Sequence, residues 1–261
     1  MKTKLLILII LLLGIGGTVL YIRSVYSNVL LQNITVGVYC YPPFAMKDPK
    51  TGRYTGFDIE LLEAVAKYKK INLIYKDLTF SDIFTEIPAG KIDMATTITI
   101  LLEREKHFRF SWPCMETGLA LAVRGDDVSI TEIENLKGKT LGTFPGTGET
   151  YSRELEKKGK VKKIFVYEDS AELYEALVNG SVDAVIGDYA VNCYYGRKLQ
   201  SKIKCFSKLY QYSYLGFPLG KSNEVLMLNL NDGIKNIISS GEYIQLHRKY
   251  FKNLKTEGNS E

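Results

Sequence analysis

The chain has 261 residues, of which 46% are hydrophobic and 24% charged, a balance that is typical of a folded globular protein and excludes a disordered or fibrous one. Its net charge of +5 is partly concentrated at the N-terminus, where Lys2, Lys4 and Arg23 fall among 27 residues without an acid. The rest of the chain is close to neutral, so we expect no nucleic-acid partner. A chain of this length forms one large domain or two of moderate size.

The N-terminus begins with a long apolar segment. Lys2 and Lys4 precede an uncharged run over residues 5–22, and about 20 apolar residues are enough to span a bilayer. Basic residues before such a run keep that end in the cytoplasm, so we expect the rest of the chain to be exported. Residues 1–27 are therefore predicted to be a cleaved signal peptide or a retained membrane anchor, with the protein in the periplasm or on the outer face of the cell membrane.

Four cysteines follow this segment: Cys40, Cys114, Cys193 and Cys205. Disulfides are permitted outside the cytosol, and the short separation between Cys193 and Cys205 favours that pair. Four cysteines allow three full pairings, and the sequence leaves all three open. Their spacing does not resemble a zinc site, and we expect neither a metal nor a cofactor.

Strand-like and helical runs alternate after the N-terminal segment, a pattern that predicts α/β units with parallel strands. Asp58 and Ser81 stand where the N-caps of the first two helices are expected. The predicted elements of this part are strands at 33–40, 71–78 and 92–97 and helices at 56–70 and 81–91.

A second set of the same kind begins near residue 119. The stretch "NGSVDAVIGD" (179–188) echoes "AGKIDMATT" (89–97), since both contain a glycine turn followed by a strand that carries an aspartate. This echo suggests two similar lobes, although shared α/β construction would also produce it. The predicted elements here are strands at 119–125, 140–144, 162–168 and 182–188, helices at 149–159, 170–180 and 189–199, and two terminal helices within 224–251.

Seven segments carry most of the information about the family. They are "YPPF" (41–44), "GFDIELLEAVA" (56–66), "FSDIFTEIPAGKIDMATTITILLERE" (80–105), "FSWPCMETG" (110–118), "LKGKTLGTFPGTGE" (136–149), "DAVIGD" (183–188) and "LGFPLGKSNEVL" (215–226). In this order they resemble the extracytoplasmic amino-acid-binding proteins of ABC importers, solute-binding protein family 3, over nearly all of residues 34–251.

The resemblance implies an α/β, two-lobed periplasmic-binding-protein-like fold with two crossing hinge segments. The first lobe would take residues 33–113 and 217–255, and the second would take 118–212. A free amino acid would bind between the lobes, which close on it, and the protein would deliver it to the permease subunits of an ABC transporter.

The resemblance also implies roles for polar residues. Arg104 would hold the ligand α-carboxylate, because a guanidinium offers a planar fork that matches it; spacing alone favours a surface helix charge paired with a glutamate. Thr97 and Thr99 would meet the carboxylate and the ammonium, although threonine is common in strands anyway. Asp188 would accept from the ammonium, cap the following helix, or do both.

Two further pairs of residues complete the predicted site. Thr147 and Gly148, in "PGTGE", would offer backbone N–H groups at a helix N-terminus, although a plain glycine turn would look the same. Tyr41 and Phe80 would enclose the ligand side chain between their rings, where the alternative is ordinary core packing.

The ligand side chain is expected to be neutral. Relatives that bind cationic amino acids often carry an acid near the end of the first strand, where this chain has Val38, Tyr39 and Cys40. This favours a polar neutral amino acid such as glutamine. The alternatives are an enzyme on the same fold that dehydrates a cyclohexadienyl acid, with Glu116 or Glu149 as its acid, and the sensing lobe of a receptor. We expect no catalytic residue and no enzymatic activity.

Overall fold

The computed structural model describes residues 33–252. The predicted signal peptide or anchor at 1–27 and the last residues of the predicted first lobe lie outside the described residues. Within the described range, no helix combines the length and the apolar composition that a bilayer crossing requires.

The first sheet has the strand order β4-β1-β5-β13-β7 (Asn72–Asp77, Asn33–Val38, Met94–Ala95, Pro218–Leu219 and Arg109–Phe110). β1 pairs in parallel with both β4 and β5, as the alternating pattern predicts. β13 returns from the far end of the sequence and pairs antiparallel with β5 and β7. This sheet is therefore built from both ends of the described chain.

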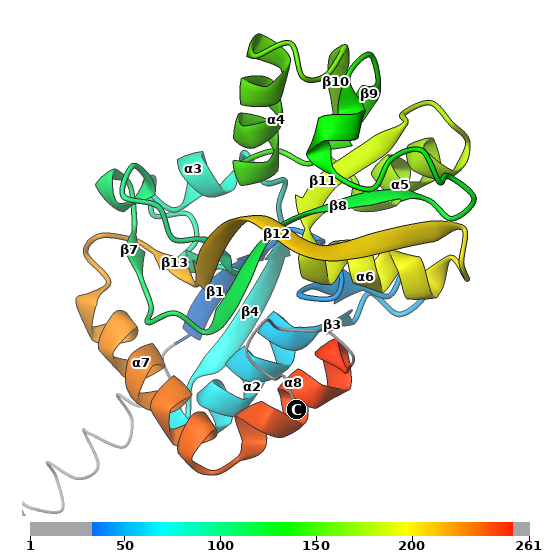
Figure 1. Ribbon diagram of the computed structural model, residues 1–261. Helices are drawn as coiled ribbons and strands as arrows, with labels where there is room; N and C mark the ends of the chain where they lie inside the picture. Colours follow the sequence, from blue (N-terminus) through cyan, green and yellow to red (C-terminus); the bar gives the residue numbers. More distant parts are fainter. Residues whose placement is uncertain (1–32, 253–261) are drawn as a thin grey trace, which may run out of the picture.

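Helices α2 (Phe57–Lys69), α7 (Glu224–Ser239) and α8 (Glu242–Phe251) pack together beside this sheet (Figure 1). The last two confirm the prediction of two terminal helices. A short helix, α3 (Ile83–Glu86), follows β4, and a small hairpin is formed by β2 and β3, residues 46–47 and 54–55.

The second sheet has the order β10-β9-β11-β8-β12-β6. β9 lies between two parallel neighbours, β10 and β11, whereas β8 and β12 run antiparallel. In that order the strands are Lys163–Val166, Thr140–Thr143, Ala184–Asp188, Met115–Arg124, Ile203–Gly216 and Ile98–Thr99.

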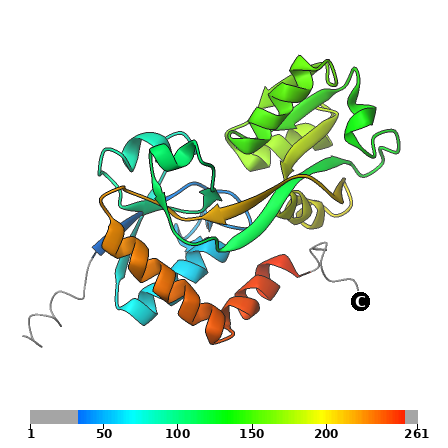
Figure 2. The ribbon, with the colours of Figure 1, turned by 60° about the vertical axis from the view of Figure 1, so that its left-hand side comes forward.

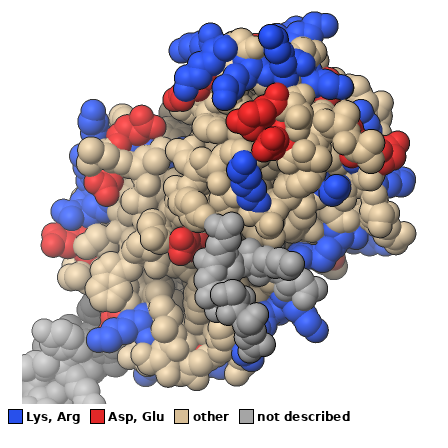
Figure 3. Space-filling model, viewed as in Figure 1, with Lys and Arg blue, Asp and Glu red and all other residues tan. Residues whose placement is uncertain are grey.

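Helices α4 (Thr147–Lys157), α5 (Ser170–Val178) and α6 (Tyr189–Lys198) accompany the second sheet, with a 3-10 turn η2 at Ile133–Leu136. Exposed lysines gather over the end of α4 and the start of β10, at the top of the space-filling view (Figure 3). They are Lys157, Lys158, Lys160, Lys162 and Lys163.

Two long strands connect the two halves of the molecule (Figure 2). β8 and β12 pair antiparallel, with Met115 opposite Leu215 at one end and Arg124 opposite Ile203 at the other. The predicted α/β fold of two lobes and two crossing segments is thus confirmed. The residue limits of the lobes stay a prediction.

Two predicted helix starts are wrong. The N-cap of α2 is Gly56, and Asp58 instead lies fully buried in the first turn, where it accepts hydrogen bonds from Thr97. The helix expected from Ser81 is only α3, and its N-cap is Asp82. In both cases an acidic or hydroxyl side chain that suits capping is used for a tertiary or local turn contact.

Candidate functional site

A narrow cavity of about 40 Å³ lies where residues of the first half face residues of the second. Aromatic rings and a few polar groups form its lining. All eight residues predicted from the sequence line it: Tyr41, Phe80, Thr97, Thr99, Arg104, Thr147, Gly148 and Asp188.

Arg104 opens a 3-10 turn, η1 (Arg104–Lys106), just after β6. Its side chain is buried, Nη1 donates to the carbonyl of Thr99 at 3.0 Å, and the guanidinium carbon lies 5.5 Å from the centre of the Phe80 ring. No ion pair joins Arg104 to a carboxylate in the described part of the chain. Surface helix charge is therefore excluded, and a buried cation is left without a counter-charge.

Asp188 ends β11 and caps α6. Its carboxylate accepts from Thr117 Oγ1 at 2.8 Å and from the backbone N–H of Ala190 at 2.9 Å. Burial raises the pKa of Asp188 to about 6, because the charged form loses hydration. No lysine, arginine or histidine among the described residues forms an ion pair with it. The capping role predicted for it is present, and the carboxylate still lacks a cation.

The N-terminus of α4 meets Arg104 across the cavity. Gly146, the N-cap, has φ 102°, and a Cβ added there would lie 3.0 Å from Phe80 Cζ and 3.1 Å from Arg104 Nη2. A Cβ on Gly148 would lie 2.7 Å from Thr143 Oγ1. The two glycines thus let the start of the helix approach both the guanidinium and the neighbouring strand. The first N–H groups of the helix and the guanidinium can therefore bind one and the same anion.

The two threonines have different surroundings. Thr97 donates its backbone N–H and Oγ1 to Asp58 at 2.8 and 2.7 Å, and its carbonyl accepts from the Tyr39 hydroxyl at 2.7 Å. Thr97 therefore has no donor left for a ligand, only lone pairs on Oγ1. Thr99 orients Arg104 through its carbonyl.

Asp58 supports the site without lining the cavity. Burial raises its pKa to about 6 against the lowering effect of the Thr97 hydrogen bonds, and its Oδ1 has no partner among the described residues. Its role was missed because an acid in a first helical turn usually signals capping or dipole compensation. The signal in the sequence was its position on the apolar face of that helix.

Aromatic rings form the remaining wall of the cavity. The Tyr41 and Phe144 centroids are 4.7 Å apart, those of Phe80 and Phe144 are 6.3 Å apart, and Tyr39 contacts Phe80 at 5.6 Å. Phe144 comes from the second half, so its contacts with Tyr41 and Phe80 cross the cleft. Arg104 and Asp188 are the only charged residues that line the cavity within the described chain.

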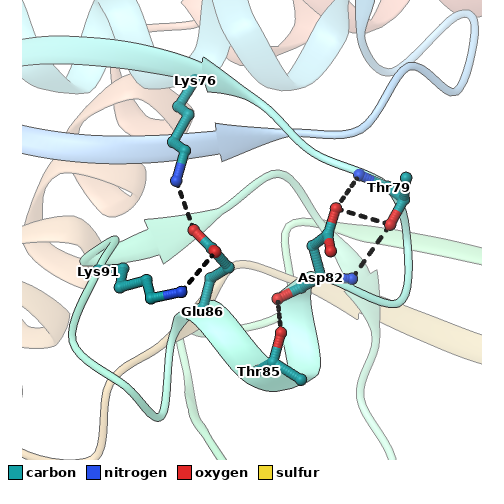
Figure 4. Close-up of polar contacts among 6 residues, drawn as sticks. All are labelled: Lys76, Thr79, Asp82, Thr85, Glu86 and Lys91. Carbon is teal, nitrogen blue, oxygen red and sulfur yellow. Dashed lines mark hydrogen bonds and ion pairs between the residues drawn. The ribbon is translucent and has the colours of Figure 1, made fainter.

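Hydrogen bonds around α3 fix the turn that carries Phe80 (Figure 4). The Asp82 carboxylate accepts from the backbone N–H and Oγ1 of Thr79 at 2.9 and 2.7 Å. Glu86 accepts from Lys76 and Lys91 at 2.5 and 3.2 Å. The turn that presents the aromatic ring is thus held at both ends.

Comparison with known proteins decides the family. Residues 34–253 match the bacterial extracellular solute-binding proteins, family 3. The chain belongs to that family. A probable amino-acid-binding protein, YxeM of Bacillus subtilis, is 30% identical over 86% of this chain and 84% of its own length.

Two solved structures support the same assignment to family 3. An ancestral arginine-binding protein bound to arginine has a TM-score of 0.78 and 31% identity, and the match covers 85% of this chain and 99% of that one. An ancestral amino-acid-binding protein that is a precursor of cyclohexadienyl dehydratase has a TM-score of 0.77 and 30% identity, over 84% of this chain and 95% of that one. Both are binding proteins by description.

The acids considered for an enzyme lie outside the cavity of this family 3 chain. Glu116 is exposed on β8, and Glu149 accepts a hydrogen bond from Arg153 at 2.8 Å in the first turns of α4. Neither lines the cavity. The only carboxyl group among its described lining residues is that of Asp188.

Proposed function

We propose that the protein captures a free amino acid in this cavity, outside the cytoplasm, and delivers it to the permease of an ABC importer. The ligand α-carboxylate would bind Arg104 and the first N–H groups of α4, at Thr147 and Gly148. The ammonium would bind Asp188. The observation that carries this proposal is one buried cation and one partly buried anion on one cavity, neither of which has an ion-pair partner among the described residues.

A zwitterion is the ligand class that satisfies both groups. A simple anion would leave Asp188 uncompensated, and a simple cation would do the same to Arg104, at a cost of several kcal/mol for a buried charge. The arginine bound by the ancestral protein belongs to this class, and YxeM is described as a probable amino-acid-binding protein.

The side chain is proposed to be neutral, with a polar one such as glutamine preferred. With Arg104 and Asp188 engaged by the carboxylate and the ammonium of the ligand, no other charged residue of the described chain lines the cavity to meet a cationic or acidic side chain. The rings of Tyr41, Phe80 and Phe144 would enclose it, and the Thr147 hydroxyl, which lines the same cavity, would hydrogen-bond a terminal amide.

Thermal unfolding with each of the twenty amino acids in turn tests the proposal. A ligand at about 100 times its Kd stabilises the folded state by about 2.7 kcal/mol, which raises the Tm of a chain of this size by about 5–10 °C. Neutral amino acids should give this shift and arginine should not. No shift with any amino acid would contradict the proposal, and turnover of prephenate would favour the enzyme.

The lobe limits are part of the same proposal. Residues 33–113 and 217–255 would move as one body and 118–212 as the other, with β8 and β12 bending between them. Small-angle scattering with and without the stabilising amino acid should show a smaller radius of gyration in its presence.

A further inference from the structure

The four cysteines are all free thiols in the structure, in different surroundings. Cys40 is exposed, and Cys114 is buried with its Sγ donating to the carbonyl of Leu215 at 3.4 Å. Neither lies beside another cysteine in any described contact. Cys193 and Cys205 differ, because they come from neighbouring elements, α6 and β12.

Cys193 and Cys205 pack in one small cluster. Cys193 is 8% exposed and lies with Ala120 and Tyr189, and the partly buried Cys205 packs against the same group. Thiols that pack in one cluster, on elements joined by a short turn, need little backbone movement to be bridged.

The two thiols are not equivalent. Cys205 is partly exposed, whereas Cys193 is buried, so a small molecule reaches Cys205 first and Cys205 is the nucleophile of the pair. The neighbouring Cys193 lowers the pKa of Cys205, and the nearby Arg197 guanidinium acts in the same direction, whereas burial opposes it. The pKa of Cys193 is raised by its neighbour Cys205 and by burial.

We propose that Cys193 and Cys205 are a disulfide-forming site, oxidised by small-molecule disulfides such as glutathione disulfide outside the cytoplasm. The Cys205 thiolate attacks one sulfur of the oxidant, forms a mixed disulfide and releases one glutathione thiolate. Cys193 then gives its proton to solvent, attacks Cys205 Sγ and releases the second glutathione thiolate. One disulfide is consumed and one is formed, so two cysteine thiols are oxidised as the oxidant becomes two thiols.

The bond would stabilise a part of the molecule that bears on the cavity. It joins α6, which Asp188 caps, to β12, one of the two crossing strands. The turn between them contains Gln200 and Ser201 at φ 47° and 65°, backbone conformations that are unfavourable for residues other than glycine. A covalent link across this turn would hold α6 against β12 even if the turn opened.

Thiol mapping of the reduced full-length protein tests the site. After incubation with glutathione disulfide, the remaining thiols are blocked with iodoacetamide and the digest is examined by mass spectrometry. We expect a crosslinked pair of peptides containing Cys193 and Cys205, an intact mass lower by two hydrogen atoms, and a Tm about 5–10 °C above that of the reduced protein. The Cys40→Ser variant should behave identically.

Single-cysteine variants keep the proposal falsifiable. Cys193→Ser should stop at a glutathione adduct on Cys205, because the second attack is lost, and Cys205→Ser should react far more slowly. The proposal is overturned if the oxidised wild type carries only iodoacetamide or glutathione on these two cysteines. A disulfide between Cys40 and either of them would overturn it as well.

Discussion

The two walls of the cavity differ in how they hold their charge. The first wall (Tyr41, Phe80, Thr97, Thr99 and Arg104) presents a cation that lies beside aromatic rings and touches one carbonyl. The second wall (Phe144, Thr147, Gly148 and Asp188) presents an anion with a hydroxyl and a backbone N–H as partners, next to a helix N-terminus.

Because of this difference, the two walls are expected to bind different parts of the ligand. On the first wall, Asp58 and Tyr39 use the polar groups of Thr97, so the wall is fixed and its free charge is Arg104 alone. On the second wall, the N-terminus of α4 attracts anions, as Arg104 does on the first wall, and Asp188 attracts cations. An amino acid is therefore expected to touch the second wall at both of its charged ends, and the first wall chiefly at its carboxylate.

The largest effect should come from removing the cation of the first wall. Arg104→Ala deletes two charge-assisted hydrogen bonds, each worth about 1.5–3 kcal/mol, so we expect the Kd of the stabilising amino acid to rise by about 10²–10⁴-fold by calorimetry. Arg109→Lys is the matched control, because Arg109 lies on the surface and donates to the Lys221 carbonyl. Equal affinity in wild type and Arg104→Ala would contradict the assigned role.

Asp188→Asn should weaken binding by about 100-fold, since the ammonium loses its counter-charge but keeps an amide oxygen. The affinity of the wild type should fall as the pH drops below about 6, because the proton that Asp188 then takes up removes its charge. An affinity that stays constant between neutral pH and about pH 5 would argue against Asp188 as the ammonium ligand.

The same variant should stabilise the ligand-free protein. The pKa of Asp188 is raised in the folded state, so the folded state binds more protons than the unfolded one between about pH 4 and 6, and the free energy of unfolding falls as pH rises through that window. Asp188→Asn removes this loss, a gain of about 1–2 kcal/mol at neutral pH after allowance for partial exposure. Denaturant unfolding of the wild type and the variant at pH 4 and at neutral pH measures this difference in the free energy of unfolding. The pKa of Asp58 is also raised, so part of the pH dependence remains in the variant.

Gly146→Ala should have a smaller effect, about 10-fold on affinity, by keeping the walls apart. Its Cβ would lie 3.0 Å from Phe80 Cζ and 3.1 Å from Arg104 Nη2 of the opposite wall, so both side chains must shift slightly, and its φ of 102° adds strain. Gly138→Ala is the matched control: its φ is 78°, and nothing lies within 4 Å of an added Cβ. If both variants lose stability but only Gly146→Ala loses affinity, the loss of affinity arises because the walls can no longer come together around the ligand.

The smallest effect expected is that of Asp58→Asn, a few-fold loss of affinity. The amide oxygen can still accept from Thr97, so the first wall should keep its shape with a weaker bond. A loss as large as that of Arg104→Ala would show that Asp58 does more than position Thr97. Calorimetry alongside a Tm measurement separates affinity from folding.

The site residues could be predicted because seven segments, in their order along the chain, resemble a known family, whereas spacing alone left the role of Arg104 open. "TITILLER" places a strand end one turn before Arg104, and "VIGDYA" places Asp188 between a strand and a helix, as the structure has them. The burial of Asp58 is signalled by its position on the apolar face of α2, but its partner could not be predicted, because nothing within the first turn of α2 shows that Thr97, 39 positions away, needs an acceptor. Likewise, the position of Phe144 between Tyr41 and Phe80 depends on how two halves of the chain meet.

Calorimetric titration of the amino acid that stabilises the protein most, together with its methyl ester and its N-acetyl derivative, tests the central claim most directly. The ester lacks the negative charge that Arg104 would bind, and the acetyl derivative lacks the positive charge that Asp188 would bind. The account predicts that each derivative binds at least about 100-fold more weakly than the free amino acid. An ester or an acetyl derivative that binds as tightly as the parent would contradict it.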